Sequence, residues 1–181
     1  FFQGSVKDAI ENAAKDKIPA CVLEGVKFIE SGPEWIGGST CLINQCSAAG
    51  PFQISVGQDA SGDRHCRACG PSWTDGSRTC NDSWPGDWPT TPTDPSPCNL
   101  QLGANQAVQI LIDKSAYFAS KPLNATDSIH SQRDAIMLAA DAYWGVTAPV
   151  ARLGGCTYGE YVYKHCDPSY QCTGNPPVRL P

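Results

Sequence analysis

Hydrophobic residues recur at helical spacing in several segments of the chain, separated by stretches rich in glycine, proline and serine. The first such segment covers residues 5–17. The second begins at Ala20 and ends at Gly32, because glycine followed by proline stops a helix. Three further helices are predicted at 104–120, 131–144 and 157–165, and Ser131 followed by Asp134 is the expected cap of the middle one. We therefore expect a mainly α protein with a minor β component in the loops.

Two regions lack this periodicity. Residues 36–63 are rich in Gly, Ser and Gln around one apolar cluster at 51–54, and they are expected to form a loop with a turn or a short strand. Proline is too frequent from 65 to 97 for any regular element, so crosslinks are the expected restraint. The cysteines available for them are Cys66, Cys69, Cys80 and Cys98. We predict a disulfide-pinned irregular insertion at about 59–97 in a domain covering 5–165, followed by a tail, 166–181, tied by Cys166 or Cys172.

Composition restricts the compartment and the partners. The chain has 181 residues and ten cysteines, which indicates an oxidising environment: secreted, periplasmic or associated with the cell envelope. Its net charge of −5 and the lack of a basic run argue against nucleic acid, and no apolar window is long enough for a transmembrane segment. No charged-then-apolar leader precedes the first helix, so we expect a mature or trimmed ectodomain, and residues 1–4 resemble the remnant of a cleavable tag. We also expect a monomer.

A metal site is the alternative use of the cysteines. Cys66 and Cys69 are spaced like one half of a zinc knuckle, with His65 beside them. The later cysteines provide no second close pair, which favours disulfides over a metal. No metal and no cofactor are therefore expected, and His130 and His165 are interpreted as isolated surface or capping residues.

One carboxyl group is predicted to have an unusual environment. On a helical wheel Glu30 falls within the apolar arc of its helix, between Val26 and Leu23, whereas Glu24 points to water beside Lys27. Burial and the negative end of the helix dipole should both raise the pKa of Glu30. A carboxylic acid kept protonated near neutral pH is what a general acid for a glycosidic oxygen requires. The alternative is a structural glutamate bonded to a backbone amide or an arginine.

Several short segments, in order, resemble motifs of the soluble lytic transglycosylases and their goose-type lysozyme relatives. Glu30-Ser31 resembles the catalytic motif, and residues 47–54 are similar to the family's Ser-x-x-Gly-x-x-Gln-hydrophobic segment. Residues 99–103 resemble its Asn-hydrophobic-x-x-Gly helix opening. Residues 139–145 resemble its Ala-rich Ala-Tyr-Asn-x-Gly segment, and 157–162 its late tyrosine-containing helix. The resemblance covers about residues 18–63 and 98–165.

The resemblance implies a lysozyme-like α+β fold whose cleft holds peptidoglycan glycan strands of β-(1,4)-linked N-acetylmuramic acid and N-acetylglucosamine. Glu30 would be the catalytic acid and then the base, giving a 1,6-anhydromuramoyl product without a second carboxylate. The substrate-binding residues it implies are Ser31, Ser47, Gly50, Gln53, Tyr143, Trp144 and Tyr158.

The same residues have structural alternatives. Gln53 is either in the cleft or a loop-to-backbone cap, and Tyr143 either approaches the acid or the N-acetyl group or is a core aromatic near a helix end. Ser47 binds substrate or caps a turn, and Gly50 permits close backbone approach. Trp144 departs from the family, which has asparagine there, and a stacking surface is expected instead.

Two other functions remain open from the sequence. If Asp59 or Asp63 positions a water, the same fold is a hydrolytic lysozyme. A non-catalytic peptidoglycan- or glycan-binding module is the second alternative, favoured by the altered Trp144 and the acidic net charge. The insertion's three tryptophans, at 73, 84 and 88, either stack on sugars at the cleft rim or form the core of the insertion itself.

Overall fold

The computed structural model describes residues 6–32, 48–55, 100–145, 147–175 and 177. This part is mainly helical, as expected, with one short β pairing. Its elements are α1 (Val6–Ala14), α2 (Ala20–Ser31), β1 (Ala48–Ala49), β2 (Ile54–Ser55), α3 (Leu100–Ala119), α4 (Arg133–Trp144), the 3₁₀ helix η2 (Ala151–Leu153) and α5 (Tyr158–Cys166). The predicted insertion at 59–97, its tryptophans and Asp59 and Asp63 lie outside the described residues.

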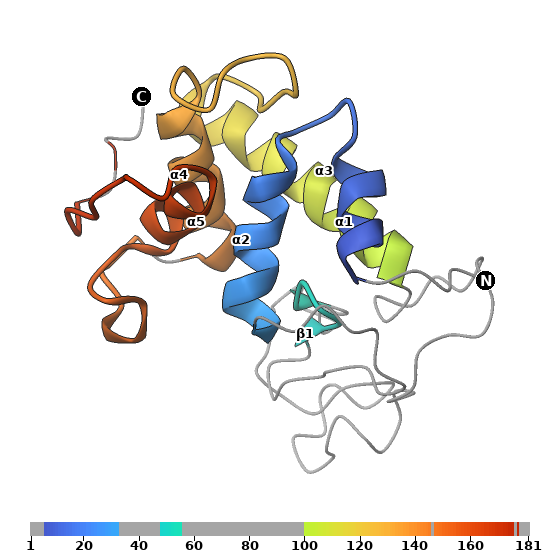
Figure 1. The fold of residues 1–181 in the computed structure, drawn as a ribbon, viewed down its shortest axis with the longest axis horizontal. Helices are drawn as coiled ribbons and strands as arrows, with labels where there is room; N and C mark the ends of the chain where they lie inside the picture. Colours follow the sequence, from blue (N-terminus) through green and yellow to red (C-terminus); the bar gives the residue numbers. More distant parts are fainter. Residues whose placement is uncertain (1–5, 33–47, 56–99, 146, 176, 178–181) are drawn as a thin grey trace, which may run out of the picture.

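The helices form a single cluster around one core. In Figure 1, α3 and α4 lie behind, α1 flanks α3, and α2 runs across the front beside α5. The closest pairings are α3 with α4, α4 with α5, α2 with α5, and α1 with α3. Fully buried side chains from four helices meet at the centre, among them Ile10, Leu23, Leu111 and Ile136.

Three helix boundaries differ from the prediction by more than one residue. α1 ends at Ala14 rather than at 17, and Asp16 beyond it has a positive φ of 60°, which a helix does not allow. α3 begins at Leu100 rather than at 104, because Leu100 and Gly103 are buried beneath α1 and extend the packed face. The predicted cap of α4 by Ser131 is wrong. Gln132 occupies the N-cap position without a side-chain cap bond, and the Ser131 hydroxyl donates to the carbonyl of Ser128 at 2.9 Å instead.

The α5 helix is positioned by a glycine and a capping box. A Cβ added at Gly159 would overlap the carbonyl oxygen of Met137, so only glycine permits this approach of α5 to α4. Thr157 accepts from the amide of Glu160 at 3.0 Å, and the Glu160 carboxylate accepts from the amide of Thr157 at 3.0 Å. These contacts set the place where Tyr158 enters the core.

The segment after α5 is held by one carboxylate. Glu160 is fully buried, and its oxygens also accept from the amide of Gly174 at 2.8 Å, the Tyr170 hydroxyl at 3.1 Å and the Thr173 amide. Burial alone would raise the pKa of Glu160, but these hydrogen bonds outweigh it and the pKa is lowered. Glu160 therefore stabilises the fold in its ionised form.

Two disulfides add covalent restraint. Cys21 of α2 is bonded to Cys166 at the end of α5, and Cys156 to Cys172. The prediction that Cys166 or Cys172 ties the tail is confirmed. All four cysteines of the described part are thus paired, while the other six lie outside it. Paired cysteines are consistent with an oxidising compartment.

One face of α2 was predicted wrongly. Lys27 is only 2% exposed, and its Nζ donates to the carbonyl of Gly32 at 2.6 Å. Glu24, expected in water, has an oxygen 3.5 Å from Nε2 of His165. His165, which was predicted to be isolated, therefore has a partner. Glu24 meets His165 because α5 packs across Gly25 of α2. Lys27 lies about 200° around the helix from Gly25, so this packing does not account for its burial.

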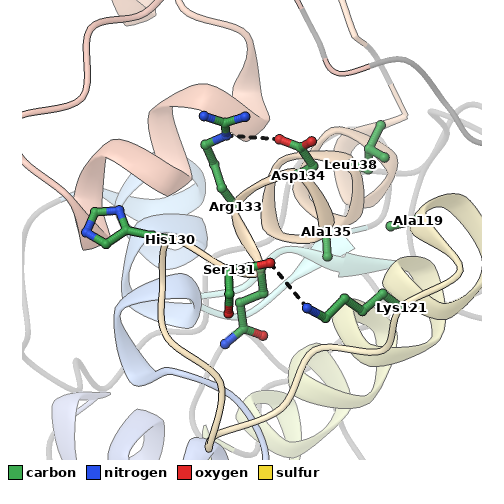
Figure 2. A pocket seen from close by; sticks show the side chains of 9 residues that line it. Ala119, Lys121, His130, Ser131, Arg133, Asp134, Ala135 and Leu138 are labelled. Carbon is green, nitrogen blue, oxygen red and sulfur yellow. Dashed lines mark hydrogen bonds and ion pairs between the residues drawn. The ribbon is translucent and has the colours of Figure 1, made fainter.

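The loop between α3 and α4 encloses a pocket of 290 Å³ at the start of α4 (Figure 2). Its two permanent cations are both paired: Nε of Arg133 lies 2.9 Å from Asp134, and Nζ of Lys121 lies 3.4 Å from Asp127. His130 is an exposed side chain at the same pocket, as predicted, but it is not isolated, because its Nδ1 lies 3.1 Å from the Tyr163 hydroxyl and 3.8 Å from Asp167. Of the predicted site residues that the structure describes, none lines this pocket.

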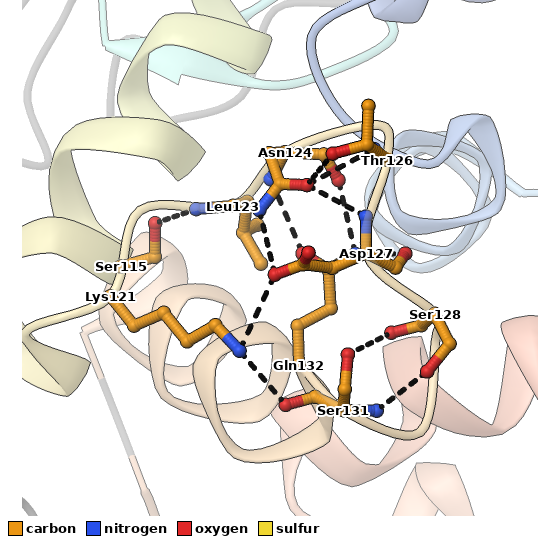
Figure 3. Close-up of polar contacts among 9 residues, drawn as sticks. All are labelled: Ser115, Lys121, Leu123, Asn124, Thr126, Asp127, Ser128, Ser131 and Gln132. Atoms are coloured by element: carbon orange, nitrogen blue, oxygen red, sulfur yellow. Dashed lines mark hydrogen bonds and ion pairs between the residues drawn. The ribbon is translucent and has the colours of Figure 1, made fainter.

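The same loop is fixed by a buried amide (Figure 3). Nε2 of Gln132 donates to the carbonyls of Asn124 and Asp127, each at 3.0 Å, while its Oε1 accepts from the amide of Asn124 at 3.2 Å. The Ser115 hydroxyl accepts from the amide of Leu123 at 2.9 Å. These bonds hold the loop that joins α3 to α4, the two helices that pack most extensively against each other.

None of the described helices is both long enough and apolar enough to cross a bilayer.

Candidate active site

Glu30 and Tyr158 meet at the centre of the candidate site. Glu30 lies in the last turn of α2, and Tyr158 is the first residue of α5. The Tyr158 hydroxyl donates to Oε1 of Glu30 at 2.7 Å. Because Tyr158 is completely buried, its hydroxyl holds the carboxyl from the core side and leaves the outer oxygen for other contacts. The structure thus shows Tyr158 bonded to Glu30, and the contact with substrate expected from the resemblance stays a prediction.

The electrostatics of Glu30 follow from three opposing causes. Burial is the largest and raises its pKa, while the hydrogen bond from Tyr158 and the charge of Arg152 lower it. The net effect is a raised pKa, which confirms the expectation based on its place in the apolar arc. A carboxyl group with a raised pKa remains protonated to higher pH than an ordinary glutamate, as proton donation requires.

A stack of side chains continues outward from Tyr158. The indole of Trp144 lies parallel to the Tyr158 ring, at 5.6 Å between centroids and 20° between planes. On Trp144 lies the exposed guanidinium of Arg152, 5.9 Å from the ring centroid. Both of these neighbours of the Trp144 ring are residues of the protein itself. Arg152 reaches the vicinity of Glu30 through this stack.

Tyr143 joins the helices to the short hairpin. Its hydroxyl donates to the carbonyl of Phe52 at 2.7 Å. Burial raises the pKa of Tyr143, and the negative charge of Glu30 raises it further, so Tyr143 lies within electrostatic range of the acid. Phe52 is buried in the core, which anchors the hairpin next to α4. The expected approach of Tyr143 to the acid is compatible with this placement.

The hairpin between β1 and β2 presents Gln53. Ala49 pairs with Ile54 across it, and Gly50 turns the chain with a φ of 78°. Gln53 itself has a φ of 48°, and its Nε2 donates to the carbonyl of Gly50 at 2.9 Å. The loop-to-backbone cap is thus present, and the same side chain also lines a pocket.

This pocket has a volume of 170 Å³ and lies between the hairpin, α3 and α4. It is lined by Gln53, Ile54, Ile110, Asp113, Lys114, Ala142 and Tyr143. Amide, carboxylate and ammonium groups lie there beside aliphatic side chains. Glu30 does not line the pocket; Tyr143 is the residue that connects the two.

The remaining predicted residues are less central. The Ser31 hydroxyl donates to the carbonyl of Lys27 at 3.2 Å, which is a bond within its own helix. Ser47 lies outside the described residues. Sequence reasoning missed Arg152, Asp113 and Lys114, because none belongs to a motif and only the packing of distant segments brings them to the site.

No group of three potential metal ligands occurs among the described residues. No protein-family model matches the chain, and neither a curated protein nor a solved structure matches it significantly.

Proposed function

We propose that the protein cleaves the β-(1,4) bond between N-acetylmuramic acid and N-acetylglucosamine in peptidoglycan, as a lytic transglycosylase with Glu30 as general acid and base. The observation that carries the proposal is the carboxyl group of Glu30: it has a raised pKa and is held on one oxygen by Tyr158. The motif resemblance of the sequence supplies the substrate class.

The proposed reaction has two proton transfers. Protonated Glu30 donates its proton to the glycosidic oxygen as the bond from C1 of the muramoyl residue to that oxygen breaks. The resulting carboxylate then takes the proton of the muramoyl 6-hydroxyl while O6 bonds to C1, which closes the 1,6-anhydro ring. Glu30 ends protonated, and no water or second carboxylate is consumed.

The neighbours of Glu30 fit both halves of this cycle. Burial favours the protonated acid that the first step needs, whereas the Tyr158 hydrogen bond and the Arg152 charge stabilise the carboxylate that the second step needs. Tyr143 and Gln53 belong to the adjoining pocket, where their polar atoms are suited to N-acetyl and hydroxyl groups. We further propose a lysozyme-like α+β fold, secretion to a cell envelope, and action as a monomer.

Product analysis tests the proposal. Purified sacculi are digested with the full chain, and the muropeptides are identified by mass spectrometry. We expect products that end in 1,6-anhydromuramic acid. Reducing ends instead would assign the hydrolytic alternative, with a water positioned by another group.

Two matched variants test the residue. Glu30→Gln should fold and release no muropeptides, while Glu24→Gln, six residues earlier on the same helix, should retain activity. Circular dichroism verifies the fold of both. If the Glu30→Gln protein still cleaves sacculi, Glu30 is not the acid. Binding to sacculi without turnover by the parent chain would favour the glycan-binding module.

A further inference from the structure

One stripe of α3 extends from the pocket along the surface of the helix. Ile110, Asp113 and Lys114 line the pocket. In a helix, residues at i, i+3, i+4 and i+7 share a face, so Tyr117 continues this stripe about 10 Å beyond Ile110. Tyr117 is 78% exposed, the only large hydrophobic side chain so exposed in the described part of the chain.

The ring of Tyr117 has defined support. Its edge meets the ring of Phe118 at 4.8 Å between centroids and 80° between planes. Nζ of Lys114 lies 5.8 Å from the centroid of the Phe118 ring. Lys114 therefore links the pocket to the aromatic pair. A single exposed aromatic is common on protein surfaces; what distinguishes this one is its alignment with a polar pocket.

The side chains along the stripe indicate which class of ligand it would bind. Asp113 and Lys114 are neighbours of opposite charge, so the stripe presents no net charge to attract an ion of either sign. It places acceptors and donors side by side, which suits a neutral ligand rich in hydroxyl and acetamido groups. Within the protein, Asp113 accepts from Nε2 of Gln109 at 2.8 Å and Nε2 of Gln53 donates to the carbonyl of Gly50 at 2.9 Å. An exposed tyrosine ring offers such a ligand a flat apolar surface at low entropic cost, since it has two side-chain torsions.

We propose that this stripe is a glycan subsite, in which Tyr117 stacks against an N-acetylated sugar at a distance from the cleaved bond while Asp113 and Lys114 bind the preceding sugar. The inference rests on the proposed function for the identity of the glycan, but binding at the stripe requires no catalysis. The subsite lets the protein distinguish long strands from short fragments.

Binding of β-(1,4)-linked N-acetylglucosamine oligomers provides the test. Titration calorimetry is performed on the full chain carrying Glu30→Gln, with the hexamer and the dimer as probes. Adding Tyr117→Ala should weaken hexamer binding on the order of tenfold and lower the preference for the hexamer over the dimer, since the hexamer spans both the stripe and the site at Glu30. Tyr117→Phe, which keeps the ring, should bind the hexamer like the parent.

The control is Asn105→Ala, at an exposed residue on another side of α3. This substitution should change the affinity for neither the hexamer nor the dimer. The subsite is overturned if the parent does not bind the hexamer, if Tyr117→Ala binds it as tightly as the parent, or if Tyr117→Phe is as weak as Tyr117→Ala. A hexamer affinity that depends on the Tyr117 ring supports the subsite even where sacculi are not cleaved. Cleavage of sacculi together with indifference to Tyr117 would leave the proposed function standing and remove the subsite alone.

Discussion

The hydroxyl of Tyr158 lies 2.7 Å from Oε1 of Glu30, although the two residues are 128 positions apart in the chain. The bond works against the burial of Glu30, because a hydroxyl donor stabilises the ionised carboxyl whereas burial favours the neutral one. The carboxyl is therefore held in place without being fixed in either protonation state. An acid that donates a proton and then recovers one must be able to adopt both protonation states.

Removing the hydroxyl should raise the pKa of Glu30 further. In Tyr158→Phe the carboxylate loses a charge-assisted hydrogen bond of about 1.5–3 kcal/mol, while burial remains. The pKa of Glu30 can be followed by carbon-13 NMR of labelled glutamate. Tyr163→Phe is the matched control, since the Tyr163 hydroxyl lies 3.1 Å from Nδ1 of His130 and not at Glu30. A titration of Glu30 that is identical in the two variants would contradict the assigned role of Tyr158.

Glu30→Gln should stabilise the fold at neutral pH. The pKa of Glu30 is raised on folding, so the folded state is penalised for carrying the charge once the pH exceeds the ordinary carboxyl value. Below that value both states are protonated and the penalty is absent. The gain in Tm should thus be present at pH 7 and disappear near pH 4, at about 2–4 °C for each kcal/mol. Equal Tm changes at both pH values would show that ionisation is not the cause.

Glu160→Gln should have the opposite effect. The pKa of Glu160 is lowered on folding, so its contribution to stability is complete above the ordinary carboxyl pKa and is lost as the pH falls through the lowered value. We expect a loss of about 3 kcal/mol at pH 7, measured by urea unfolding, because several donors to the carboxylate lose strength together. The loss should shrink in acid. A loss that is independent of pH would indicate that packing, and not charge, is affected.

Arg152→Met should extend proton donation to higher pH. The guanidinium charge lowers the pKa of Glu30, so its removal raises that pKa and keeps the acid protonated further into the basic range. The basic limb of the activity profile on sacculi should move upward. Arg152→Lys, which keeps the charge, should leave the limb in place, and added salt should reduce the difference because Arg152 is exposed. If methionine and lysine behave alike, the charge of Arg152 does not act on Glu30.

Much of the helical framework could be predicted, because it depends on local patterns. The spacing of Val26 and Leu23 and the stop at Gly32 place Glu30 in the last turn of a helix and inside its apolar arc, and the raised pKa follows from that. The start of α3 was predicted four residues too late, because its first turn is buried only through packing between helices that are distant in the sequence. The cap at Ser131 failed because the competing bond to Ser128 belongs to the preceding loop.

The sequence by itself determined which carboxyl is unusual, since burial and position along one helix are properties of a single segment. Only the tertiary structure decided what surrounds that carboxyl. Tyr158 reaches Glu30 because Gly159 lets α5 approach α4, and His165 reaches Glu24 because α5 also crosses α2 at Gly25. A helical wheel shows how apolar each face of a helix is, but not how many other helices cover it. That number depends on packing between residues far apart in the chain.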